Sequence, residues 1–136
     1  MLAALPGDAN SWTVVDMEAG LEHLSRSEGT LRFVDHLLVV IEPYAKAIET
    51  ARRTIPIAAE LGIPRTSVVA NKVRDEDERR TVERFCADIG TELLAVVPYD
   101  DAVRAADRDG RAPIDHAPGS PLVQAVDDLA RALDHA

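Results

Sequence analysis

The sequence predicts an α/β fold in which a parallel sheet of about four strands carries helices on both faces. Two observations support this prediction. Short runs rich in valine, isoleucine and leucine, typical of buried strands, alternate with stretches of helical apolar periodicity. Such alternation produces right-handed β-α-β units, and 136 residues are enough for one domain of this kind with a buried core.

Four runs have the composition of strands, and polar or special residues stand at their ends. The carboxyl ends of parallel strands meet at one edge of the sheet, where open α/β folds bind their ligands. Strand ends are also polar simply because loops face water, so the pattern has a plain structural explanation too. The predicted strands are Trp12–Asp16, His36–Ile41, Ser67–Ala70 and Leu93–Val97; the last three are followed by Glu42-Pro43, Asn71-Lys72 and Pro98-Tyr99-Asp100.

The segments between the strands contain helix signals. Asp75 is expected to cap a helix that has an acidic first turn and ends before Gly90. Ser120 caps the last helix, with proline in its first position, and residues 111–119 form a loop. The predicted helices are about Tyr44–Leu61 with a bend at Pro56, Glu76–Ile89, Asp101–Arg108, and one from Pro121 with the stripe Leu122, Val126, Leu129 and Leu133.

Composition and charge exclude several classes of function. The net charge of −9 argues against a nucleic-acid backbone or an anionic membrane as partner, and no apolar run is long enough to span a bilayer. Cys86 is the only cysteine, which excludes an internal disulfide and favours the cytoplasm. Residues 1–11 are expected to be poorly structured, followed by a single α/β domain over residues 12–136. The histidines are expected to be surface or turn residues; they are His23, His36, His116 and His135.

Two strand ends carry the residues of most chemical interest. Asp16 ends the first predicted strand and Gly20 follows four residues later, a spacing that suits a metal-bound water and a phosphate, or simply a strand and a turn. The amide of Asn71 offers a donor and an acceptor together, which matches a purine edge, although a turn residue can use the same groups on its own backbone. Lys72 can pack its stem over a base or face water.

Several segments, in their order along the chain, resemble the MinD/ParA-type deviant P-loop ATPases. The resemblance covers about residues 12 to 134 and is strongest to the CooC-type branch, the nickel-insertion ATPases of carbon monoxide dehydrogenase maturation. It rests on the runs Asp16-Met17-Glu18-Ala19-Gly20-Leu21-Glu22-His23-Leu24, Val39-Val40-Ile41-Glu42-Pro43, Asn71-Lys72-Val73, Val97-Pro98-Tyr99-Asp100 and Ala106-Asp107-Arg108-Asp109-Gly110.

The resemblance implies a role for each residue at the strand ends. Asp16 would hold the water shell of Mg²⁺, and Gly20 would lie near the γ-phosphate of ATP. Asn71 would bind the adenine edge with Lys72 beside it. The loop that closes over the base through its backbone would consist of Pro98, Tyr99 and Asp100. Family members dimerise around ATP, and hydrolysis resets the dimer, so the resemblance also implies a homodimer and a metalloenzyme client.

The chain departs from this family in the phosphate and nickel sites. It contains no Gly-x-x-x-x-Gly-Lys-Ser/Thr pattern, so the phosphate-binding loop, the Mg²⁺-binding hydroxyl and the lysine charge are missing. The nickel site of the CooC branch is a Cys-x-Cys pair, and Cys86 stands alone. The chain therefore resembles the carboxyl-terminal part of such an ATPase, without the Walker A region, and is expected to be inactive alone.

Two other functions fit the sequence. One is a non-catalytic interaction module that pairs with itself or with a P-loop-bearing partner chain through an exposed sheet edge. The other is a flavodoxin-like or receiver-like domain, which is disfavoured because a receiver needs a phosphorylatable acid where Asn71 stands. Membrane attachment of the MinD kind is not expected, because the polar side of the last helix is acidic.

Overall fold

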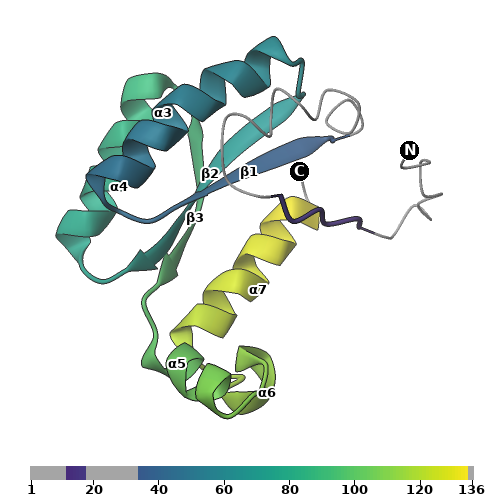
Figure 1. Cartoon of the computed structure of the whole chain (residues 1–136), viewed down its shortest axis with the longest axis vertical. Coiled ribbons are helices and arrows are strands. Elements are labelled where there is room, and N and C mark those ends of the chain that lie inside the picture. Colours follow the sequence, from purple (N-terminus) through teal and green to yellow (C-terminus); the bar gives the residue numbers. More distant parts are fainter. Residues whose placement is uncertain (1–11, 18–33, 135–136) are drawn as a thin grey trace.

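The computed structural model describes residues 12–17 and 34–134, and in that part of the chain one sheet of three parallel strands is formed. Helices α3 and α4 cover one face of the sheet, and α7 lies on the other (Figure 1). This confirms the predicted fold class. The elements are β1 (His36–Ile41), α3 (Ala45–Glu60), β2 (Arg65–Val73), α4 (Glu76–Ile89), β3 (Glu92–Pro98), α5 (Asp101–Arg108), α6 (Pro113–His116) and α7 (Pro121–Asp134).

The strand predicted at Trp12–Asp16 does not form. Residues 12–17 have no regular secondary structure and pair with no described strand. The side chain of Val14 is 84% exposed, whereas a strand inside this sheet would bury it. Strand propensity records how well a side chain fits a paired, half-buried surface, so a β-branched run without a neighbouring strand has nothing to stabilise it.

Strand β2 is the centre of the sheet and pairs with β1 on one side and β3 on the other. Its residues from Ser67 to Ala70 are all buried, so both faces of this stretch are covered. Pairing extends β2 beyond the predicted Ser67–Ala70, with Arg65 opposite His36 at its start. As a result, Asn71 and Lys72 lie within the last part of the strand rather than after it.

The main core lies between the sheet and the two helices that cover it. Val82 of α4 and Val68 of β2 are fully buried, and Ala51 of α3 is 1% exposed. The small side chain of Ala51 allows α3 to approach the strands closely. The buried members of this core are Ile41, Ala51, Val68, Ala70, Val73, Val82, Phe85 and Cys86.

The caps of α4 confirm the sequence-based boundaries. The Asp75 carboxylate accepts a hydrogen bond from the Glu78 backbone N–H at 2.9 Å, and the Glu78 carboxylate accepts one from the Arg74 N–H at 2.7 Å. This reciprocal pair satisfies two backbone donors at the helix start. Gly90 ends the helix with a φ of +67°, a left-handed conformation that glycine adopts without a Cβ penalty.

Three details of the helices differ from the prediction or refine it. Helix α3 continues through Pro56 to Glu60, so the proline removes one donor without ending the helix. The predicted loop at residues 111–119 contains the short helix α6, which starts at Pro113. In the predicted stripe of α7, Val126 is 47% exposed.

None of the helices in the described residues is long and apolar enough to cross a membrane.

A polar chain crosses the three strands near their amino ends. Ser67 Oγ donates a hydrogen bond to Glu92 Oε2 at 3.0 Å, and Arg65 donates one to the same oxygen at 3.0 Å. His36 Nε2 lies 2.9 Å from Ser67 Oγ. Because the only hydroxyl proton of Ser67 is used on Glu92, the histidine donates in this contact. The chain links neighbours in register, because Ser67 stands opposite Glu92.

This polar chain makes stability depend on pH. Hydrogen bonds from Arg65 and then Ser67 hold the pKa of Glu92 below its ordinary value, so the folded chain binds fewer protons there than the unfolded chain. The resulting stability is present above the unfolded pKa and is lost as pH falls through the folded one. We expect Glu92→Gln to flatten the fall in unfolding free energy between about pH 5 and pH 3, measured by urea titration. Glu60→Gln at the exposed end of α3 is the control, and equal slopes for both variants would contradict the prediction.

Candidate functional site

The carboxyl ends of the three strands meet at one edge of the sheet and bring together residues from all of them. Glu42 follows β1, and Lys72 lies in the last part of β2. Their side chains form an ion pair, with Lys72 Nζ 2.7 Å from Glu42 Oε1. The hydrogen bond to Glu42 raises the pKa of Lys72 above its usual value, so this lysine is charged at neutral pH. No local pattern predicts this contact, because 30 positions separate the two residues.

A β-bulge lies at Asn71 and Lys72. The register of β2 against β3 shifts between Ala70 and Val73, and Lys72 has a φ of +58°. Lys72 is the only non-glycine residue with positive φ in the described ranges. A left-handed conformation costs a non-glycine residue roughly 1–2 kcal/mol. Bulges next to binding sites commonly re-aim a side chain, and here the bulge falls at the pair that the sequence indicated.

Asn71 is half-buried at this edge. Its Oδ1 accepts a hydrogen bond from the backbone N–H of Lys72 at 3.0 Å, which is the local turn contact that the sequence left open. An amide oxygen has a second lone pair, and the amide nitrogen carries two donors. The hydrogen bond to Oδ1 therefore orients the amide. The second lone pair and the two N–H donors suit a ligand that offers both a donor and an acceptor, as a purine does.

The loop after β3 is tied to both neighbouring elements. The backbone N–H of Tyr99 donates to the carbonyl of Val73 at 2.8 Å, which continues the pairing with β2 past Pro98. Asp100 Oδ1 accepts from the N–H of Ala102 at 2.8 Å, and its Oδ2 accepts from the N–H of Leu122 at 3.2 Å. Asp100 thus holds the start of α5 next to the start of α7. The hydrogen bond from Ala102 is the main reason why the pKa of Asp100 lies below its ordinary value.

Two arginines that sequence reasoning did not identify belong to the same edge. The guanidinium of Arg74 lies over the Tyr99 ring, 4.6 Å from its centroid. A hydrogen bond to Tyr99 raises the pKa of Arg104 above its usual value. Both arginines contact Tyr99, so they add positive charge at the loop after β3 in a chain that is acidic overall. In the sequence, the one available sign that an arginine belongs to this edge is the position of Arg74, three residues after Asn71.

The structure does not bring Asp16 to this edge. Asp16 is exposed, and its neighbour Met17 packs against the second apolar cluster, which includes Val34 and Ile63. Those two residues precede β1 and β2, so Met17 lies near the amino ends of the strands. Gly20 lies outside the described residues. The edge therefore contains Asn71, Lys72 and the loop after β3 without the predicted switch acid, whose role stays a prediction.

The remaining candidates for metal or thiol chemistry give no site. No cluster of three or more histidine, cysteine, aspartate or glutamate side chains suited to a metal ion occurs within residues 12–17 and 34–134. Cys86 is buried in the core, and burial raises its pKa to about 11, so the thiol is protonated and unreactive at neutral pH. His23 and His135 lie outside the described residues.

Comparison with known proteins agrees with this fold. The chain is 43% identical to an uncharacterized ATP-binding protein of Methanocaldococcus jannaschii over 90 residues. The aligned stretch covers 66% of the chain and 34% of that protein. It is 39% identical to the carbon monoxide dehydrogenase accessory protein CooC of Rhodospirillum rubrum over 106 residues. This alignment covers 77% of the chain and 38% of CooC. The MinD cell division protein of Aquifex aeolicus aligns with a TM-score of 0.62 and 25% identity, over 75% of the chain and 44% of MinD. No protein-family model matches the chain.

A parallel sheet with helices on both faces, and with polar groups gathered at its carboxyl edge, defines an open α/β protein of the kind that binds ligands at that edge. The relatives sharpen that description. The chain matches part of a MinD/ParA/CooC-type P-loop ATPase. It spans little more than a third of the length of the two curated relatives described above.

The two hydrogen bonds of Asp100 lead to a prediction about stability. Asp100→Ala removes the cap of α5 and the contact with α7, and loss of a helix cap typically costs about 1 kcal/mol. We expect the free energy of unfolding to fall by about 1–2 kcal/mol, measured by urea titration. Asp107→Ala on the exposed side of the same helix is the matched control and should change stability by less than about 0.5 kcal/mol. Equal losses in the two variants would contradict a capping role.

Proposed function

We propose that the chain is the base-binding part of an ATP-binding domain of the MinD/ParA/CooC type, inactive alone. The observation that carries the proposal is the bulge at Asn71 and Lys72 next to the loop of Pro98, Tyr99 and Asp100. The Asn71 amide would pair with the adenine edge, and the backbone of the loop would close over the base. Lys72 and Arg74 would lie beside it. The Methanocaldococcus jannaschii relative, which is named an ATP-binding protein, supports this assignment.

The phosphate half of the proposed site is not supplied by the residues at hand. The printed sequence has no glycine-rich phosphate loop with its lysine. The charged amine of Lys72 is already paired with Glu42. In this proposal Asp16 orients the water shell of Mg²⁺ and Gly20 approaches the γ-phosphate only when a segment that carries the phosphate loop is also present. ATP and Mg²⁺ are therefore ligands of the completed domain.

The wider activity is proposed on the same basis. A completed domain would form a homodimer around ATP in the cytoplasm. It would assist a metalloenzyme client, because the CooC relative is an accessory protein of carbon monoxide dehydrogenase. A nickel site of the Cys-x-Cys kind is not part of the proposal. Cys86 is the single cysteine of the chain, and it is buried in the core.

The first test measures nucleotide binding by the isolated chain. Without phosphate contacts, ATP should bind no more tightly than adenosine in isothermal titration. Asn71→Ala should weaken both about tenfold, because it removes hydrogen bonds worth about 1 kcal/mol or more together. Gln124→Ala, which deletes the amide of α7, is the matched control and should bind as the wild type does.

An ATP hydrolysis assay tests the proposed inactivity and the assignment of Asp16. We expect the isolated chain to show no ATP turnover. Turnover abolished by Asp16→Ala would contradict the proposed inactivity, and turnover unaffected by that variant would contradict the assignment of Asp16. Equal nucleotide affinity in the Asn71 variant and the wild type would contradict the proposed base site.

A second candidate function is a non-catalytic interaction module. It is favoured by an exposed apolar side chain on the edge strand β1, Val40, which is 60% exposed. Exposed apolar groups at a sheet edge typically bind another chain. The partner would be a second copy or a polypeptide that carries the phosphate loop.

Size-exclusion chromatography with light scattering tests this second function. We expect concentration-dependent association of the wild-type chain, reduced by Val40→Lys because a charge on the sheet cannot be buried in the contact. Val126→Lys on the exposed side of α7 is the matched control and should associate as the wild type does. A monomer at the highest concentrations reached, for the wild type as well, would contradict the interaction module.

A further inference from the structure

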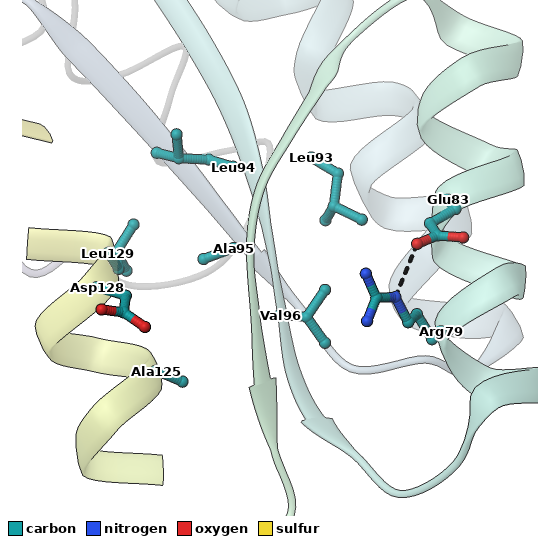
Figure 2. Close-up of a pocket in the computed structure, with 9 residues that line it drawn as sticks. All are labelled: Arg79, Glu83, Leu93, Leu94, Ala95, Val96, Ala125, Asp128 and Leu129. Carbon is teal, nitrogen blue, oxygen red and sulfur yellow. Dashed lines mark hydrogen bonds and ion pairs between the residues drawn. The ribbon is translucent and has the colours of Figure 1, made fainter. Parts of the chain in front are cut away.

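A groove of about 530 Å³ follows the outer side of β3. Figure 2 shows α4 on one side of this strand and α7 on the other, with Leu93 and Val96 directed toward α4 and Leu94 and Ala95 toward α7. The groove is therefore centred on the strand itself. Its lining residues are Arg79, Glu83, Leu93, Leu94, Ala95, Val96, Ala125, Asp128 and Leu129.

Strand β3 has a free edge in the described part of the chain, because the sheet order is β1-β2-β3. A free edge offers backbone N–H and C=O groups that can pair with an added strand. The register shift between Val68 and Val69 places Leu93 and Ala95 opposite them and leaves Leu94 without a partner on β2. This bulge explains why Leu94 and Ala95 point to the same side, where they widen the apolar wall facing Leu129 (Figure 2).

A second folded copy of the chain does not fit this edge. Helix α7 packs directly on β3. Two β3 strands paired edge to edge would lie about 4.8 Å apart. The two α7 helices on the same face would then lie closer than the roughly 8–10 Å that packed helices need. The occupant must therefore be an extended segment without a helix of its own at that point.

The charges of the groove indicate the chemistry of that segment. On the α4 side, Arg79 Nε and Glu83 Oε1 already form an ion pair at 2.8 Å. On the α7 side, Asp128 and Arg131 form a long ion pair at 3.7 Å, while Arg131 is hydrogen-bonded to Asp127. The Asp128 side chain is 75% exposed and can pair with a further cation, and the net charge of −9 favours the approach of a basic partner.

We propose that this groove binds a short, extended basic peptide segment as an added strand on β3. Apolar side chains of the segment would pack against Leu94, Ala95 and Leu129, and a lysine or arginine would pair with Asp128. The site lies away from the carboxyl edge of the sheet and does not depend on nucleotide binding.

The test uses a fluorescein-labelled octapeptide in which valine and lysine alternate, titrated against the full chain by fluorescence anisotropy. We expect saturable binding below millimolar concentration and protection of the backbone amides from Leu93 to Val96 in hydrogen exchange. Asp128→Asn should weaken binding about threefold, as expected for a partly exposed ion pair. Asp134→Asn makes the same charge change on the same helix outside the groove and should leave the affinity unchanged.

Three results would overturn the proposal. One is absence of binding at millimolar peptide. The second is equal weakening by both aspartate variants, which would mean that the basic peptide is attracted to the acidic surface in general. The third is protection in hydrogen exchange confined to β1, which would place the peptide at the opposite edge of the sheet.

Discussion

The structure depends on the burial of β2 between two parallel neighbours. The stretch from Ser67 to Ala70 is covered on both faces and paired on both edges, so a shift by one residue would turn every side chain to the opposite face and disrupt the packing on both sides. That constraint sets the position of Asn71 and Lys72 relative to Glu42 and to the loop after β3. The strained backbone of Lys72 persists because the strand before it and the pairing after it are both held.

Local signals in the sequence were sufficient for most of the fold. The caps at Asp75, Asp100 and Ser120 depend on side chains that bond to a backbone a few residues away, so their patterns can be read along the chain. The apolar runs of β1, β2 and β3 were equally clear. The run at Trp12–Asp16 also has a strand-like composition, but it does not form a strand. A strand needs a neighbouring strand to pair with, and no pattern within the run indicates whether one exists.

The candidate site was predictable only in part. The common location of Asn71 and the loop of Pro98 to Asp100 could be predicted because strand ends in a parallel sheet share one edge. The Lys72–Glu42 ion pair, the bulge and the Arg74–Tyr99 contact depend on which residues lie opposite each other between neighbouring strands, which single-strand patterns do not specify. Asp16 shows the converse, since its expected place at the edge assumed a strand that is not formed.

The chemistry of the edge decides what the chain can do by itself. A few neutral hydrogen bonds of about 1 kcal/mol each, with stacking of about 1–3 kcal/mol for the base, barely exceed the cost of immobilising a small ligand. Tight binding of a nucleotide in P-loop proteins comes instead from backbone amides and a lysine on the phosphates, where charge strengthens each contact. In the proposed function, the carboxyl edge would therefore select a base without holding a triphosphate. In the proposed function, a segment that carries the phosphate loop would lie beside β1, the edge strand whose Val40 is 60% exposed.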